Sequence, residues 1–154
     1  MKLGEALARR SDVQTRIAQV RDRLAATALV QEGDEPPEPS EALLRELDAL
    51  LDELRDLVVA VNRTNAATQL PSGATLTEAL AHRDVLGMRH GTLNAIVAAT
   101  AQAQARYSRS EIRIVRTVDV AALRRAADEA AKERRELDAE IQQVNWTVEV
   151  MEDG

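Results

Sequence analysis

The sequence predicts a mainly α-helical protein whose four long helices form an antiparallel, up-down-up-down bundle. Apolar residues recur every three or four positions over most of the chain, which places them along one face of a helix. The segments 31–40 and 65–75 interrupt this pattern with proline and glycine, which end helices. Phe is absent, and Ala and Leu dominate the apolar residues, a composition that suits close packing between helices. Four helical segments with short connections fold most simply as a bundle.

The first two predicted helices differ in the width of their apolar faces. Residues 3–29 carry a single heptad pattern, which ends at the loop 31–40, QEGDEPPEPS, because its prolines cannot continue a helix. The second helix, about 41–64, carries two apolar stripes and therefore needs two neighbours. We expect it to lie at the centre of the bundle or at a subunit interface. The first stripe contains Leu43, Leu47, Leu50, Leu54, Leu57 and Val61, and the oligomer-interface candidates are Leu44, Leu51, Val58 and Trp146.

The third predicted helix begins after the turn 65–75, whose tip holds Pro71 and Gly73. Thr75-Leu-Thr-Glu78 is a capping box, which marks a helix start, and the helical pattern then runs to about 105. From 91 to 105 the sequence holds no charged residue. A solvated helix normally shows charge in every turn, so we expect this half of the helix to be buried on several sides.

The connection 106–118 breaks the helical pattern. Residues 111–114 alternate polar and apolar side chains, and β-branched residues continue to Val118. We predict a short strand near 111–117 that pairs with an arm of the turn at 68–76, as a β-hairpin element. Asp119 then caps the last helix. The whole chain, 1–154, is expected to form one domain; the alternative is an extended coiled coil that buries its stripes between subunits.

Three arginines, Arg10, Arg83 and Arg134, fall on apolar seam positions of the predicted helices. A buried arginine needs an acidic or carbonyl partner, and polar seam residues can fix helix register or oligomeric state. The other interpretation is that these side chains extend along the edge of the seam to water.

Net charge and composition exclude several classes of function. The net charge of −6 argues against general binding to nucleic acid or anionic membranes. There is no cysteine, so disulfides and thiolate metal sites are excluded. The first residues lack the apolar core of a secretory signal, and no stretch approaches the roughly 18 apolar residues of a membrane-spanning helix. We therefore expect a cytoplasmic protein.

No motif in the sequence predicts catalysis or metal binding. Di-iron bundles use a glutamate three residues before a histidine, but Ala79 and Gly87 stand three residues before His82 and His90. There is no nucleophile elbow, phosphate-binding glycine loop or His-Glu-x-x-His pattern. We therefore predict no catalytic residue, no metal, no cofactor and no enzymatic activity. The sequence leaves open whether a small molecule binds.

The one local candidate for a binding site is the arginine stretch before the last helix. Arginines beside a helix N-terminus can bind a phosphate or carboxylate, and a tyrosine can stack on a base. The spacing matches no phosphate motif, which favours a second interpretation. In that interpretation the arginines pair with acidic residues of the second and fourth helices, in the same or a neighbouring subunit. The anion-binding candidates are Arg106, Tyr107, Arg109, Arg113 and Arg116.

The chain also contains several segments that resemble one known family. They are MKLGEALARRSDVQTRI, ALVQEGDEPPEPS, VNRTNAAT, TLTEALAHRDVL, RYSRSEIRIVRTVDVAALRR and IQQVNWTVEVME. Together they resemble the septicolysin-like family, small bacterial proteins common in actinobacteria, over nearly the whole chain. The resemblance implies a mostly helical, soluble fold without assigned catalytic residues. The family name implies a haemolytic or pore-forming toxin.

The sequence as a whole predicts a self-associating structural or interaction module, a homo-oligomer without catalytic activity. Two alternatives stay open. The first is a pore-forming or membrane-active protein whose helices rearrange on a bilayer. The second is an anion or nucleic-acid binder that uses the 106–116 stretch, although the acidic net charge disfavours nucleic acid.

Overall fold

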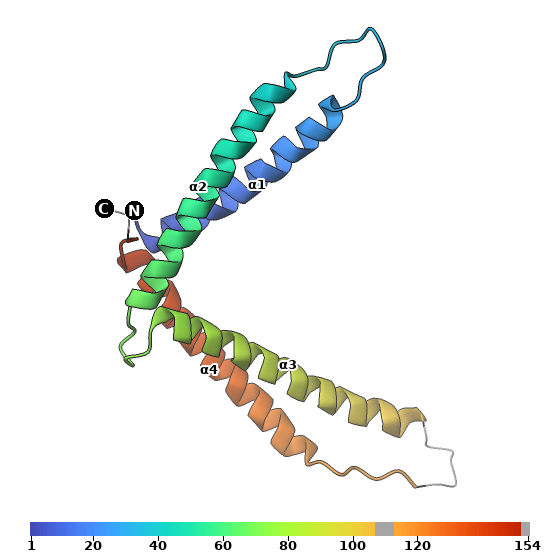
Figure 1. Ribbon diagram of the computed structural model, residues 1–154. Helices are drawn as coiled ribbons and strands as arrows, with labels where there is room; N and C mark the ends of the chain where they lie inside the picture. Colours follow the sequence, from blue (N-terminus) through green and yellow to red (C-terminus); the bar gives the residue numbers. More distant parts are fainter. Residues whose placement is uncertain (107–112, 152–154) are drawn as a thin grey trace. The chain divides into compact units, whose positions relative to one another are not determined.

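Four long α-helices account for most of the computed structural model, which describes residues 1–106 and 113–151; the side chains of residues 103–106 lie outside this description. The prediction of a mainly α-helical protein with four helices is confirmed (Figure 1). The chain divides into two compact units, Met1–Thr68 with Val144–Gly154, and Gln69–Gln143. The helices are α1 (Leu3–Thr27), α2 (Ser40–Ala67), α3 (Leu76–Arg106) and α4 (Val120–Thr147).

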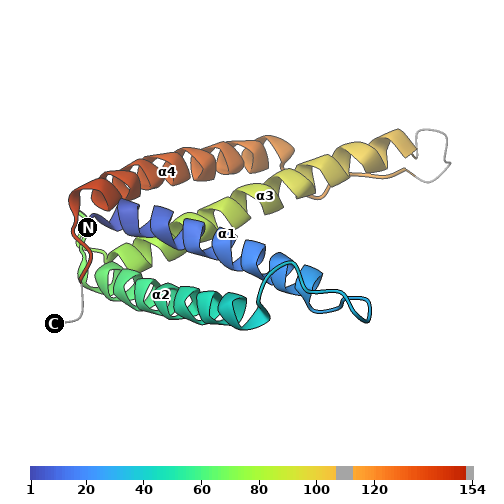
Figure 2. The same cartoon turned by 90° about the horizontal axis from the view of Figure 1, so that it is seen from above.

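The first unit is built on an antiparallel pair of helices, α1 and α2, which run side by side in both views (Figure 1 and Figure 2). Ion pairs fix the direction, since Arg9 reaches Glu53 while Arg23, further along α1, reaches the earlier Glu46. The seam between them is apolar, and its side chains are almost completely buried because the heptad spacing sets them all on one face. They are Leu3, Ala6, Val13 and Val20 of α1 and Leu43, Leu50, Leu57 and Val61 of α2.

The C-terminal residues of the chain complete the first unit by pairing with its N-terminus. The Leu3 amide donates to the Val148 carbonyl at 2.9 Å, and the Val150 amide donates to the Met1 carbonyl at 2.8 Å. Thr64, fully buried on α2, accepts a hydrogen bond from the Met151 amide at 2.9 Å through its hydroxyl. The tail is therefore held by backbone bonds on one side and by a buried hydroxyl on the other.

The second unit contains α3 and α4 up to Gln143, and α4 runs back along α3 (Figure 1). Its first residues form the turn before α3, where Gly73 adopts a positive φ of 87° and donates to the Leu70 carbonyl. The predicted capping box is confirmed, since Glu78 accepts from the Thr75 amide at 2.7 Å and Thr75 Oγ1 accepts from the Glu78 amide at 3.2 Å. The small buried core consists of Leu70, Leu76, Ala79, Leu86, Ala127, Ala130 and Ile141.

The predicted β-hairpin element is wrong. In the described part of 111–117, residues 113–117, there is no strand, and residues 111 and 112 lie outside the described residues. The turn at 68–76 instead closes on itself through a single antiparallel bridge between Gln69 and Thr75. Alternation of polar and apolar residues is typical of a strand, but a strand also needs a neighbouring backbone to pair with. A helical bundle is consistent with the four helices, while the up-down-up-down order and the single domain 1–154 stay predictions.

The expectation that the charge-free half of α3 is buried is also wrong for this chain by itself. Among residues 91–102, none is buried, and most side chains are exposed. The prediction equated the absence of charge with burial inside one chain. The sequence pattern contains no information on which chain supplies the covering surface.

Candidate interaction surface

The inner face of α3 meets α4 through polar contacts. Arg83 donates to Asp84 at 3.0 Å and to Asp138 of α4 at 3.2 Å, and its side chain is 25% exposed. The hydrogen bond with Asp84, and then that with Asp138, raises the pKa of the Arg83 guanidinium. This seam arginine therefore has the acidic partner that its position predicts.

Two further contacts continue the same inner face toward the far end of α3. A Cβ atom at Gly87 would lie 3.2 Å from Nε of Arg134, so the long arginine side chain packs against bare backbone. His90 Nδ1 lies 3.0 Å from the Ala127 carbonyl oxygen, which only accepts, so Nδ1 is the donor. His90 Nε2 lies 3.1 Å from Asn94 Nδ2 and accepts from that amide. The inner face is thus held by hydrogen bonds as much as by apolar burial.

Another side of α3 carries an apolar stripe whose larger side chains are exposed, although Val85 also lines a hollow shared with α4 and Ile96 lines one shared with residues 114–118. Val85, Met88 and Ile96 are 59%, 71% and 38% exposed. Spacing of three and four residues aligns the stripe along one side of the helix over roughly 21 Å. We call it the outer stripe of α3, and its residues are Val85, Met88, Thr92, Ile96 and Ala99.

The surface is hollowed at both ends of the outer stripe. A hollow of about 350 Å³ adjoins its N-terminal end and is lined by Val85, Met88, Arg89, Thr92 and Leu93. A second hollow of about 410 Å³ lies between α3 and the segment that leads into α4. We call it the distal groove, and it is lined by Ile96, Ala99, Thr100 and residues 114–118.

The predicted arginine site is only partly visible. Arg106 is the last residue of α3, its side chain lies outside the described residues, and Tyr107 and Arg109 lie there entirely. The described members, Arg113 and Arg116, are exposed, and Arg116 lines the distal groove. The structure therefore brings a basic residue to the edge of an apolar groove, and anion binding there stays a prediction.

The predicted oligomer-interface residues lie mainly on the surface of the first unit. Leu44 and Leu51 are 48% and 46% exposed, and Val58 is half-buried. Trp146 is 61% exposed, with one part of its indole against Gly4, where an added Cβ would come within 3.1 Å of the ring. Their role in an interface stays a prediction.

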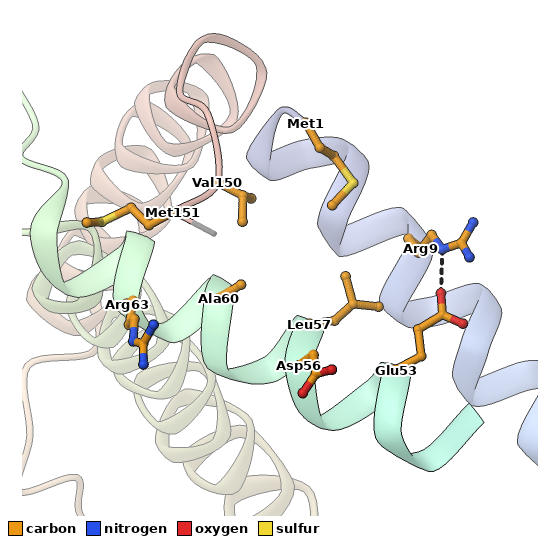
Figure 3. A pocket seen from close by; sticks show the side chains of 9 residues that line it. All are labelled: Met1, Arg9, Glu53, Asp56, Leu57, Ala60, Arg63, Val150 and Met151. Carbon is orange, nitrogen blue, oxygen red and sulfur yellow. Dashed lines mark hydrogen bonds and ion pairs between the residues drawn. The ribbon is translucent and has the colours of Figure 1, made fainter. Parts of the chain in front are cut away.

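A cleft that the sequence reasoning missed lies in the first unit (Figure 3). It has a volume of about 720 Å³, and the ion pair between Arg9 Nε and Glu53 Oε1, at 2.5 Å, lies at one side. Its walls come from both ends of the chain and from α2, so no local sequence signal could have indicated it. In the described part of the chain no buried side-chain polar atom lacks a hydrogen-bond partner. It is lined by Met1, Arg9, Glu53, Asp56, Leu57, Ala60, Arg63, Val150 and Met151.

Two further features of residues 1–106 and 113–151 concern metal binding and membrane insertion. No three histidine or carboxylate side chains gather there in a way that could hold a metal ion. No helix in the same residues is long and apolar enough to cross a membrane. The absence of catalysis, metal and cofactor, and the cytoplasmic location, stay predictions.

Comparison with known proteins gives relatives without an assigned role. No curated protein matches the chain. A solved structure described as a functionally unknown conserved protein from Corynebacterium diphtheriae is 42% identical, with a TM-score of 0.90, over 98% of this chain and 99% of that chain. None of these findings carries the septicolysin-like name, and that resemblance stays a prediction. The model of a family of unknown function, DUF6847, matches residues 10–150, and the chain therefore belongs to this family.

Proposed function

We propose that this protein is a self-associating helical interaction module without catalytic activity, and that its contact surface is the outer stripe of α3. One observation carries the proposal: the charge-free half of α3 has no buried residue between 91 and 102, and Val85, Met88 and Ile96 project from the same helix. Contiguous apolar surface of this kind marks interaction sites, since its exposure to water is unfavourable by about 25 cal/mol per Å².

The chemistry of the stripe favours another copy of the same chain as the partner. Because two chains that each carry a net charge of −6 repel one another across most of their surface, a second copy can bind only through a region with little charge. The charge-free half of α3 allows contact without placing like charges together. Its small residues, among them Ala95 and Ala99, also allow helix axes to approach closely, as in other alanine-rich helix pairs.

Sedimentation equilibrium of a double variant tests this proposal. Met88→Glu with Ile96→Glu adds charge to the stripe, and since both side chains are exposed, the fold of the single chain is retained. We expect the dissociation constant of the oligomer to rise at least about tenfold, which corresponds to about 1.4 kcal/mol.

The matched control is Leu44→Glu with Leu51→Glu on α2, which adds the same charge to the rival exposed stripe. We expect this variant to stay associated, apart from a small effect of net charge. Dissociation by the α2 variant alone would place the contact on α2 and remove α3 from the proposal.

The two alternative functions predict different results. A membrane-active protein releases dye from liposomes, and no release across lipid types and pH would end that hypothesis. An anion binder that uses the arginine stretch binds members of a nucleotide panel and loses binding in the double variant Arg109→Ala with Arg113→Ala. No binding by the wild type would end the second alternative.

A further inference from the structure

The outer stripe of α3 has the same spacing in both directions. Its five residues follow one another at intervals of three, four, four and three, so Thr92 lies at the midpoint. A two-fold axis at Thr92 would therefore set an antiparallel copy of α3 in register with the first. Val85 would face the partner's Ala99, and Met88 would face the partner's Ile96.

This register matches large side chains to hollows. Met88 is 71% exposed, and Ile96, the residue opposite it in the register, lies at the edge of the distal groove of about 410 Å³. An unbranched thioether adapts to an irregular hollow better than a branched side chain does. Val85 would face the partner's Ala99, the smallest residue of the stripe, so a larger side chain on one copy packs against a smaller one on the other.

The same register keeps charges apart. Arg89 beside the stripe stands level with the partner's Ala95, and Asp84 stands level with the partner's Thr100. A parallel pair would instead set Arg89 level with its own copy and place two helix dipoles side by side in the same direction, which is unfavourable. Charge and spacing therefore select the antiparallel arrangement.

We propose that two copies of this chain pair through antiparallel α3 helices about a two-fold axis at Thr92. The inference rests on the proposed function, because it needs self-association, and it adds the direction and register of the contact. Such an interface is isologous: every contact occurs twice, and the assembly closes as a dimer rather than growing into a filament.

Engineered cysteines test the register directly, since the chain has none of its own. Helix axes about 9 Å apart, with Cα atoms about 2.3 Å from each axis, bring the Cα atom of Thr92 within about 4–5 Å of its copy. A disulfide spans Cα atoms about 4.4–6.8 Å apart. We expect Thr92→Cys alone to form a covalent dimer under mild oxidation.

Two further variants distinguish antiparallel from parallel pairing. Val85 lies seven residues from the axis, so two copies of Val85→Cys stand about 21 Å apart and form no disulfide by themselves. The same holds for Ala99→Cys. A mixture of the Val85→Cys and Ala99→Cys chains should form the covalent heterodimer. Ala49→Cys, at an exposed position on α2, gives the background rate from random collision.

The outcomes separate this inference from the proposed function. Crosslinking of Val85→Cys by itself, as fast as that of Thr92→Cys, would show parallel pairing and overturn the inference. A wild-type dimer in which Thr92→Cys crosslinks no faster than Ala49→Cys would also overturn it, yet would leave self-association intact. A wild type that is monomeric throughout would remove both.

Discussion

The two helix pairs of this protein are held together by different kinds of side chain. Between α1 and α2, leucine and valine fill the seam, and ion pairs such as Arg9–Glu53 lie at its edge. Between α3 and α4 the contacts include an arginine–aspartate pair and a histidine bonded to a backbone carbonyl, and much of the buried core is alanine. The first pair is therefore packed mainly by apolar burial, whereas the second combines a small apolar core with hydrogen bonds.

The two pairs also differ in where their large apolar residues lie. α1 and α2 put many of theirs against one another, although Leu44 and Leu51 stay at the surface. α3 leaves Met88 and Ile96 exposed, and Val85, also exposed, lines a hollow that it shares with α4 residues. A helix that has polar and apolar contacts on its inner face and exposed apolar side chains elsewhere is suited to a further partner, and the proposed dimer supplies that partner.

The largest effect on stability is expected from truncating a buried side chain between α1 and α2. Leu50→Ala removes a side chain that is 2% exposed, and we expect it to lower the free energy of unfolding by about 2–5 kcal/mol. The adjacent Leu51→Ala, at a position 46% exposed, should cost less than about 0.5 kcal/mol. Urea denaturation measures both, and equal losses would show that α2 does not bury one face only.

Adding one methyl group to a glycine in each compact unit compares how tightly the two units are packed. Gly4→Ala places a Cβ 3.1 Å from the rigid indole of Trp146 and 3.2 Å from the Asn145 carbonyl, so we expect a loss of about 1–3 kcal/mol. Gly87→Ala meets the flexible Arg134 side chain at 3.2 Å, and better helix propensity should give a gain of about 0.5 kcal/mol. Thermal melting measures whether each substitution raises or lowers the stability. A loss of stability for Gly87→Ala that matches the loss for Gly4→Ala would contradict looser packing around Gly87.

A smaller and pH-dependent effect is expected where the chain ends meet. Hydrogen bonds from Lys2, and then from the N-terminal amine, lower the pKa of Glu149 to about 2 from an ordinary value of 4.5. Because the folded pKa is depressed, this stabilisation is fully present above pH 4.5 and is lost as the pH falls toward 2.

Glu149→Gln should therefore destabilise the protein at pH 7 and flatten its stability profile between those two pH values. Urea midpoints at a series of pH values measure this, with Asp12→Asn, an exposed carboxylate with no ion pair among the described residues, as the control. Identical acid profiles for the wild type and Glu149→Gln would show that the Lys2 contact does not hold the tail.

Much of this architecture could be predicted from the sequence, because helix periodicity and capping are local properties. The heptads placed Leu3, Val13 and Leu43 in the seam, and Thr75 with Glu78 marked the start of α3. What could not be predicted depends on distant partners. The strand near 111–117 required a neighbouring backbone, and the pairing of Leu3 with Val148 joins opposite ends of the chain.

The candidate surface shows the same limit. The absence of charge between 91 and 105 led to a prediction of burial that is wrong for residues 91–102 of this chain by itself. The composition of a helix does not indicate which surface would cover it. The arginines drew attention to 106–116, and the described part of that stretch adjoins the distal groove at the end of the same α3 surface.

The most direct test of self-association through the second pair is the mass of the native protein in solution. Sedimentation equilibrium over a micromolar concentration range should give a reversible dimer, at twice the chain mass of 16.9 kDa. A mass of one chain at every concentration would contradict the account, because the apolar face of α3 would then stand in water without a partner.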